Sequence, residues 1–332
     1  ALSGSHPECP RLCRGMVTDS TYPGLNVRNI EGLLRGMASK VEPTATQKKA
    51  ASASHKYLRD LMDTGGIGNR ILRSFLSGSY VRGTAVNPLG DVDIIFLIDE
   101  SKWATGFFST RPEPSVVLRS FADAVRYRYE KSSAFTQRRS IRLELSHIDI
   151  DCVPAIEIPG SDYIWVGDRK DDAWIKSSPQ LHHTALTKAN QLCDGWAVPA
   201  IKLLKAWNRS LPATAQVRSF VIETIAVTAL TAAPQKTLQD CVLGFFDFVV
   251  QFRSDFLQIG NPRLGITISG VFGMTVPDLA RTGGNVASGI SGDHATSFMD
   301  RANRSRELLH GGLHARTEDS AAKHVFAALG WA

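Results

Sequence analysis

Two aspartates on an apolar segment are the residues in this sequence with the clearest chemical potential. Residues Asp91–Ile98 read Asp-Val-Asp-Ile-Ile-Phe-Leu-Ile, with the polar side chains at one end only. Because strand side chains alternate between faces, we expect Asp91 and Asp93 to project from the same side of a buried strand. Buried carboxylates are costly unless a cation neutralises them, and oxygen ligands suit Mg²⁺. The pair therefore predicts a metal site.

A third carboxylate comes from a later segment. Residues Ser140–Val153 alternate between apolar and polar side chains and predict a third long strand, closed by Pro154. Asp149 and Asp151 again stand two residues apart on it. Of the two, Asp151 is nearer to Pro154, and we expect it to join Asp91 and Asp93 in one site.

A phosphate-binding segment precedes the first aspartate pair. Residues Ile71–Leu76 predict a short strand, and Tyr80–Val86 predict a brief helix after Ser77-Gly78-Ser79. At such a strand-to-helix turn, Gly78 permits close backbone approach, and the Ser79 hydroxyl can bind a terminal phosphate. Alone, Gly-Ser is a common loop and an Asp is most often a turn residue or cap. The order of a strand, Gly-Ser, a short helix, a strand with two Asp residues and a later strand with Asp favours a catalytic site for metal and phosphate.

The elements that position these residues can be read from apolar periodicity. Helices are expected at Asn26–Lys40, Thr46–Met62 and around Ser115–Lys131. Beyond Pro179 the pattern changes to long helical segments, with apolar faces within 198–207 and 220–230. The C-terminal half is therefore expected to be mostly helical.

Composition limits the class of protein. The 332 residues are 43% hydrophobic and 21% charged, and no apolar run is long enough to span a bilayer. The five cysteines are odd in number and scattered, with no secretion signal before them, so we expect a reducing, cytoplasmic environment. Cys9 with Cys13 lacks the second ligand pair of a zinc site. Residues 1–15 are expected to be a disordered terminus or a remnant outside the native fold, with Met16 as a possible start. A net charge of +6 favours polyanionic partners, nucleoside triphosphates included.

The motifs resemble those of a known family. Ser77-Gly-Ser-Tyr-Val-Arg-Gly-Thr-Ala-Val followed by Asp91-Val-Asp-Ile is similar to the signature of the polymerase β nucleotidyltransferase superfamily. Asp151-Cys-Val-Pro-Ala resembles the third motif of bacterial cGAS/DncV-like nucleotidyltransferases and oligoadenylate synthases. The likeness covers roughly 41–309 and continues in three helical-lobe motifs that begin at Leu203, Arg218 and Asp278. Asp278-Leu279 and Gly284-Asn285 depart from the Asp-Pro and double Asn common in the family.

The resemblance implies an α+β fold. A polymerase β-like core, with a mixed sheet and flanking helices, would occupy 16–175. A helical lobe resembling the C-terminal domain of oligoadenylate synthases would occupy 176–332, with the active site in the cleft between the lobes. It also implies that Lys205 neutralises the triphosphate, that Ser219 hydrogen-bonds it, and that Phe220 stacks on the donor base. Glu223, one helical turn beyond Ser219, is interpreted as positioning its neighbours.

The implied reaction joins nucleoside triphosphates and releases pyrophosphate. Two Mg²⁺ ions, replaceable by Mn²⁺, would be held by Asp91, Asp93 and Asp151, and Gly78 and Ser79 would help to fix the triphosphate. ATP, GTP or both are the expected substrates, with pyrimidine nucleotides also open. The product would be a cyclic di- or trinucleotide that a downstream effector binds in bacterial anti-phage signalling. No long nucleic acid is expected as a partner, because the chain has no lysine-rich tail or zinc-bearing Cys/His cluster.

Other interpretations remain open at this stage. The same three acids could serve a tailing enzyme that acts on RNA or an enzyme that modifies a small molecule such as an aminoglycoside. A catalytically inactive nucleotide-binding scaffold is a further alternative. His147 beside Asp149 and the pair His182-His183 favour surface or supporting roles, because no nucleophile motif lies near them. Trp165 and Trp174 flank the charged segment 167–172, where they could line an acceptor pocket or simply pack.

Overall fold

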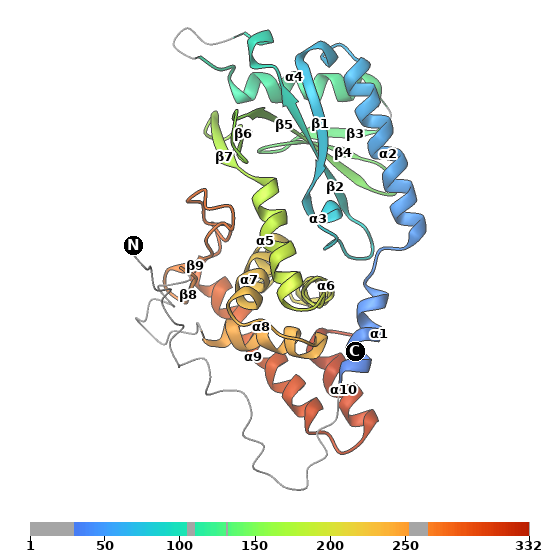
Figure 1. Cartoon of the computed structure of the whole chain (residues 1–332), viewed down its shortest axis with the longest axis vertical. Coiled ribbons are helices and arrows are strands. Elements are labelled where there is room, and N and C mark those ends of the chain that lie inside the picture. Colours follow the sequence, from blue (N-terminus) through green and yellow to red (C-terminus); the bar gives the residue numbers. More distant parts are fainter. Residues whose placement is uncertain (1–29, 105–109, 131, 252–264, 332) are drawn as a thin grey trace, which may run out of the picture.

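The computed structural model describes residues 30–104, 110–130, 132–251 and 265–331. These residues form a lobe built on a β-sheet and a lobe built of helices, with α5 (Pro179–Leu192) leading from one to the other (Figure 1). Within these ranges, no helix combines the length and the apolar character needed to cross a bilayer. The residues considered for a zinc site, Cys9 and Cys13, and the expected terminus 1–15 lie outside the described ranges.

The first lobe is organised around a mixed sheet. In the described residues its strands are ordered β1-β2-β5-β4-β3, and β6 and β7 continue from β5. β1 and β2 are antiparallel, whereas β2 and β5 are parallel. The strand bounds are β1 Ile71–Ser77, β2 Asp91–Ile98, β3 Ser133–Thr136, β4 Ile141–Glu144, β5 Asp149–Glu157, β6 Ile164–Asp168 and β7 Ala173–Ser177.

The two faces of this sheet differ in what they bury. One face carries the even-numbered residues of β2, such as Ile94 and Phe96, which pack with Leu58 and Phe121 from α2 (Ala45–Thr64) and α4 (Pro114–Arg128). The opposite face has only a small apolar cluster, formed by Ile95, Leu97, Ala155, Ile164 and Val166. The period of two therefore places Asp91 and Asp93 on the face that the helices of this lobe leave open.

The expected single strand over Ser140–Val153 is wrong. The chain turns between Leu145 and Ile148, where the Leu145 amide donates to the Ile148 carbonyl at 3.0 Å. The resulting strands β4 and β5 pair antiparallel, with Leu143 opposite Ile150. In one continuous strand, odd-numbered Leu143 and even-numbered Ile150 would face opposite sides, yet both are fully buried in the same core. Only a turn that resets the alternation puts both on one face.

Pro154 does not close the strand either, because β5 continues to Glu157. The register of β4 against β5 ends at Cys152, and that of β6 begins at Ala155. Pro154 lies at this change of neighbour, where a residue without an N–H removes no ladder hydrogen bond on that side.

One further local expectation needs correction. The short helix expected at Tyr80–Val86 is α3, Gly78–Val81, so it begins directly at the glycine. The charged segment 167–172 includes the end of β6 and the loop of the hairpin that joins β6 to β7, with Gly167 opposite Trp174. The expected helices at Thr46–Met62 and around Ser115–Lys131 agree with α2 and α4. Thr44 starts α2 with a capping box, in which Gln47 donates to and accepts from the cap residue.

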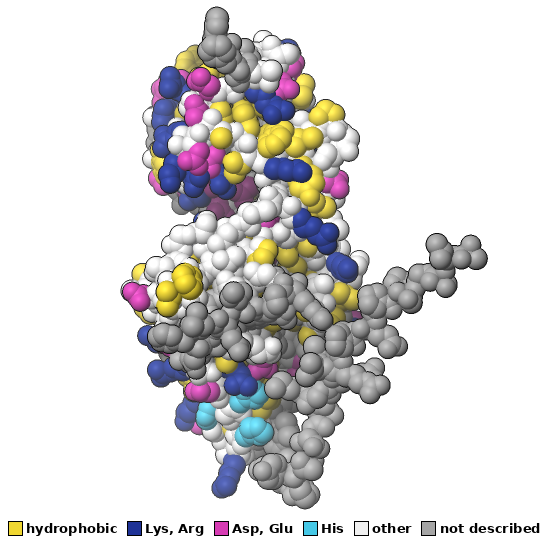
Figure 2. Space-filling view, turned by 90° about the vertical axis from the view of Figure 1, so that its left-hand side faces the viewer, with side chains coloured by type: hydrophobic (Ala, Val, Ile, Leu, Met, Phe, Trp, Pro, Cys, Tyr) yellow, Lys and Arg dark blue, Asp and Glu magenta, His cyan; other side chains and the backbone are white. Residues whose placement is uncertain are grey.

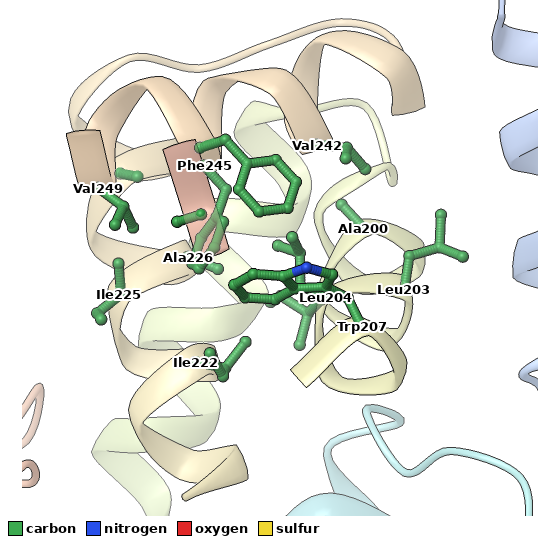
Figure 3. Close-up of a cluster of buried hydrophobic side chains, with 14 of the residues drawn as sticks. Ala200, Leu203, Leu204, Trp207, Ile222, Ile225, Ala226, Val242, Phe245 and Val249 are labelled. Carbon is green, nitrogen blue, oxygen red and sulfur yellow. The ribbon is translucent and has the colours of Figure 1, made fainter. Parts of the chain in front are cut away.

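The second lobe is a bundle around Trp207. In Figure 3, Trp207 lies among Leu204, Ile222, Ala226 and Phe245, which come from three helices. Its ring meets Phe246 edge-on, with centroids 5.0 Å apart, and its indole N–H donates to Ser305 Oγ at 2.9 Å. The remaining elements are α6 Ala197–Ser210, α7 Ser219–Ala232, α8 Leu238–Gln251, β8 Thr267–Ser269, β9 Gly273–Thr275, α9 Gly292–Leu313 and α10 Glu318–Leu329.

The first described helix, α1 (Glu31–Lys40), packs with the second lobe although it precedes the sheet in the chain. Leu34 and Met37 belong to the core of the helical bundle, and Glu31 accepts hydrogen bonds from the backbone at the start of α8. Figure 1 shows α1 beside α10, at the opposite end of the chain. The expected division at residue 176 therefore assigns α1 to the lobe that it does not pack with.

Candidate active site

The strand register brings the three predicted aspartates together. β2 and β5 run parallel, with Asp91 opposite Asp149 and Asp93 opposite Asp151. Residues paired in this way share a face, so all four carboxylates lie at the start of two neighbouring strands. Pairing of these strands joins residues nearly 60 positions apart in the chain, as the sequence analysis expected.

Crowding of negative charge changes the titration of these acids. Burial, followed by the charges of Asp91 and Asp151, raises the pKa of Asp93 to about 7. Burial and the charge of Asp151 also raise the pKa of Asp91. Both shifts mean that ionising these carboxyl groups costs free energy when no cation is bound. A divalent ion would reduce this cost.

Arg142 is a cation of this site that was not predicted from the sequence. It stands opposite Asp151 in the register of β4 and β5. Its Nη2 donates to Asp151 Oδ2 at 2.6 Å and its Nε to Oδ1 at 3.1 Å, and Nη2 also lies 3.5 Å from Asp91 Oδ2. These hydrogen bonds and the neighbouring carboxylates raise the pKa of Arg142 further above its ordinary range. A hairpin register that only the fold reveals places it there.

The carboxylate set fits Mg²⁺ in its chemistry, because it supplies hard oxygen donors from three side chains at the start of two adjacent strands. As the side chains stand, no group of three or more His, Cys, Asp or Glu in the described ranges is drawn together into a preformed metal site. The contacts of Arg142 give a reason, since they engage both oxygens of Asp151. Ion binding would therefore require Asp151 to share its oxygens between Arg142 and the metal.

Gly78 approaches one of these acids closely. It follows β1, whose last residue, Ser77, pairs with Asp93, and its φ is +72°. A Cβ added at Gly78 would lie 1.7 Å from Asp93 Oδ2, so no other residue fits without displacing the carboxylate. The structure thus gives a reason for glycine here that differs from the expected approach of a phosphate, because the group that Gly78 accommodates is the Asp93 carboxylate. Ser79, the next residue, lines the same cleft.

A buried polar cluster joins the two lobes behind this site. Glu223 on α7 accepts from Arg82 Nε at 2.5 Å, from Thr84 Oγ1 at 2.7 Å and from Lys205 Nζ at 2.5 Å. Lys205 also donates to the Thr84 carbonyl and hydroxyl oxygens. Although burial opposes it, the charges of Lys205 and Arg82 lower the pKa of Glu223 to about 2. These contacts agree with the interpretation of Glu223 as a residue that positions its neighbours.

Ser219 and Phe220 begin α7 on the helical side of the cleft. The ring of His182, from α5, meets Phe220 edge-on, with centroids 5.1 Å apart. His182 Nε2 lies 2.5 Å from Asp278 Oδ1, and Thr282 donates to the other oxygen of Asp278. His182 therefore has a supporting role, as expected, and it connects Phe220 to the loop that carries the last motif.

Hydrogen bonds fix the loop of the last motif, although its sequence departs from the family pattern. Asn285 Oδ1 accepts from the amides of Val276 and Ala287, and its Nδ2 donates to the Met274 carbonyl. One asparagine thus fixes the backbone on both sides of the loop.

The other singled-out side chains lie away from the acids. Trp174 donates to the Pro112 carbonyl at 2.8 Å, and Trp165 lies under Arg111, so both tryptophans pack within the sheet lobe. His147 contacts Ser54 at 2.9 Å. Of the two interpretations of the tryptophans, simple packing is the one that matches these contacts.

One cleft of about 1150 Å³ contains all of the predicted site residues. The sheet lobe contributes Gly78, Ser79 and the three acids, and the helical lobe contributes Lys205, Ser219 and Phe220. The space-filling view shows the molecule narrowing between the lobes, with recessed acidic side chains beside Lys and Arg (Figure 2). Fold and site together are those of a nucleotidyltransferase of the polymerase β type.

Comparison with known proteins narrows this class. Residues 31–190 match the family model of the Second Messenger Oligonucleotide or Dinucleotide Synthetase domain. A cyclic AMP-AMP-AMP synthase from Acinetobacter sp. is 25% identical over 299 residues, which are 86% of this chain and 80% of the relative. CdnC of Escherichia coli MS115-1, solved with ATP, superposes with a TM-score of 0.70 at 19% identity. The match covers 90% of this chain and 97% of the CdnC chain.

A second solved structure extends the likeness. CdnG of Bradyrhizobium diazoefficiens, a CD-NTase in complex with GTP, gives a TM-score of 0.67 at 13% identity over 91% of this chain and 97% of its own. These likenesses support the assignment to the bacterial cGAS/DncV-like nucleotidyltransferases that the motifs suggested.

Proposed function

We propose that this enzyme joins nucleoside triphosphates, with release of pyrophosphate, into a cyclic di- or trinucleotide second messenger. The observation that carries the proposal is the register of β2 and β5, which sets Asp91, Asp93 and Asp151 at one edge of a cleft lined by both lobes. A small acceptor suits a cleft of about 1150 Å³. ATP, GTP or both are the proposed substrates, because a relative is a cyclic AMP-AMP-AMP synthase and CdnC was solved with ATP.

The proposed cofactor is Mg²⁺, held by Asp91, Asp93 and Asp151. When bound, it would lower the pKa of the attacking ribose hydroxyl and stabilise charge on the departing pyrophosphate. The residues of the chain supply position: Gly78 gives the triphosphate access to the backbone, and Ser79 and Ser219 offer hydroxyl groups to its oxygens. Phe220 presents a ring edge-packed by His182, on which the donor base can stack.

The same site can serve each bond if the linear intermediate turns in the cleft. Its free hydroxyl would then meet its own triphosphate end beside the same acids, and the ring would close without a covalent enzyme intermediate. We further propose that a downstream effector binds the product in anti-phage defence, a role that rests on the likeness to this family.

The decisive experiment incubates the purified enzyme with pairs of labelled nucleoside triphosphates and Mg²⁺ or Mn²⁺, followed by phosphatase and mass measurement. A phosphatase-resistant product without terminal phosphates supports ring closure. Only linear, phosphatase-sensitive chains, or nucleotides added to RNA or a small molecule, would reject it. The Asp93→Asn enzyme, prepared in parallel, controls for contaminating polymerases.

A further inference from the structure

Arg82 lies where it can reach a bound triphosphate, although it is not among the site residues predicted from the sequence. It comes directly after α3, the short helix that begins with Gly78 and Ser79, and it lines the cleft. Its Nε donates to Glu223, and its guanidinium carbon lies 5.6 Å from the centroid of the Phe220 ring. In the part of the chain that the structure describes, its two terminal nitrogens have no hydrogen-bond partner. A planar fork with free terminal N–H groups matches phosphate oxygens.

Lys205, the residue that the family resemblance assigns to the triphosphate, is placed differently. Its side chain is 3% exposed. An ammonium has three N–H donors, and the contacts with Glu223 Oε2, Thr84 O and Thr84 Oγ1 account for all three. A direct hydrogen bond from Lys205 to phosphate would therefore break one of these buried contacts, at a cost that Arg82 does not incur.

Glu223 determines how the charge of the cluster is presented. Arg82 and Lys205 carry two positive charges and Glu223 one negative, so the cluster keeps one net positive charge beside the cleft. Because Glu223 binds Arg82 through Nε, the guanidinium is held by its near side and its terminal nitrogens are left for a ligand. The bond also crosses between lobes, since Arg82 and Glu223 are 141 residues apart in the sequence.

We propose that Arg82 hydrogen-bonds the triphosphate of the donor nucleotide directly and that Glu223 is the positioning residue that orients it. Lys205 supports this arrangement by binding Glu223 and Thr84. The inference rests on the proposed function, because it names the residue that receives the phosphates of the nucleotide substrate.

Nucleotide binding tests the assignment without relying on turnover. Isothermal titration with Mg²⁺ compares a non-hydrolysable ATP analogue with AMP, which lacks the β- and γ-phosphates. Arg82→Gln is expected to weaken the ATP analogue by about tenfold or more, because a charge-assisted bond is lost, and to change AMP affinity by less than about twofold. Arg82→Lys is expected to lie between, because one ammonium cannot serve Glu223 and phosphate with the geometry of the fork.

Glu223 is tested through a double-mutant cycle. Glu223→Gln is expected to weaken the ATP analogue selectively, and Arg82→Gln/Glu223→Gln is expected to bind no more weakly than Arg82→Gln, because Glu223 acts through Arg82. Independent, additive losses would reject the positioning role. Should Glu223→Gln fail to fold, the variants of Arg82 still decide the phosphate contact.

Two variants serve as controls. Arg73→Gln removes the same charge from β1, where Arg73 pairs with Glu157 at 2.6 Å, and is expected to bind both ligands as the native protein does. Lys205→Met is expected to lower the melting temperature. We expect it to change the preference for the ATP analogue over AMP only slightly.

The outcomes separate the inference from the proposed function. Equal weakening of ATP analogue and AMP in Arg82→Gln overturns the inference, as does an unchanged affinity of Arg82→Gln for the ATP analogue, whatever the result for Lys205→Met. If the native protein itself binds no nucleotide triphosphate, the proposed function fails instead.

Discussion

The guanidinium of Arg142 binds both carboxylate oxygens of Asp151, through Nε at 3.1 Å and Nη2 at 2.6 Å. This ion pair joins β4 to the start of β5, beside Asp91 and Asp93 at the start of β2. One arginine thus provides positive charge for a group of carboxylates and fixes the orientation of the third acid. Stability without metal should depend on it.

We therefore expect Arg142→Gln to destabilise the metal-free protein by roughly 2 kcal/mol, since it leaves a buried Asp151 without its partner. Mg²⁺ should restore much of this loss by neutralising the same acids. Thermal unfolding in EDTA and then in excess Mg²⁺ measures both effects. Arg73→Gln, which breaks an exposed pair, should cost at most about 1 kcal/mol in either condition. A loss that Mg²⁺ leaves unchanged would contradict this role of Arg142.

The acids themselves should be indispensable for turnover. Asp91→Ala or Asp93→Ala is expected to lower product formation by roughly a thousandfold or more, because several kcal/mol of metal-dependent stabilisation disappear, while circular dichroism shows a native fold. Asp149→Asn is the matched control, since it removes a carboxylate from the same face, opposite Asp91. We expect it to retain activity within about tenfold. Normal turnover by either alanine variant would contradict the assignment of the active site.

Gly78 offers a test of close packing against a catalytic acid. Gly78→Ala would place a methyl group 1.7 Å from Asp93 Oδ2 at a φ of +72°, so both activity and stability should fall. Gly83→Ala isolates the backbone effect, because Gly83 has a φ of +70° and nothing within 4 Å of an added Cβ. It should cost about 1 kcal/mol and spare activity. Equal behaviour of the two variants, by melting temperature and product yield, would argue against the contact with Asp93.

The raised pKa of Asp93 predicts how metal-free stability depends on pH. The raised pKa keeps a proton on Asp93 in the folded protein up to about pH 7, whereas the unfolded chain releases it near the ordinary Asp pKa of 3.8. Between these values the native state binds more protons, so this group makes the protein less stable as pH rises from about 4 to 7. Unfolding in EDTA at several pH values measures the slope. Asp93→Asn should show a flatter dependence than the native protein, and identical slopes would contradict the shift.

Ser79 should contribute to binding of the substrate phosphates. Ser79→Ala is expected to weaken nucleotide triphosphate by several-fold, because about 1 kcal/mol of hydrogen bonding is removed, with little change in melting temperature. Isothermal titration with Mg²⁺ gives the affinity. Unchanged affinity in Ser79→Ala would leave the backbone at Gly78 as the phosphate contact on this side of the cleft.

The site was predictable from the sequence to the extent that it follows from local patterns. Alternation along β2 places Asp91 and Asp93 on one face whatever lies next to the strand, because the period of two is a property of the extended backbone. The need for a glycine before Ser79 likewise follows from a strand that turns abruptly into a helix. The split of 140–153 into two strands was also available, since the apolar positions change parity between Leu143 and Ile150.

Tertiary structure alone decided which distant residues meet. Arg142 reaches Asp151 because of a hairpin register, and Arg82 reaches Glu223 because the helical lobe closes on the end of α3. No periodicity encodes such contacts, since their energy is gained only when both segments are already folded and desolvated. The same holds for α1, whose apolar face is typical of any amphipathic helix. Only the folded helical lobe, formed by later segments such as α6, α8 and α10, offers the apolar surface that buries this face.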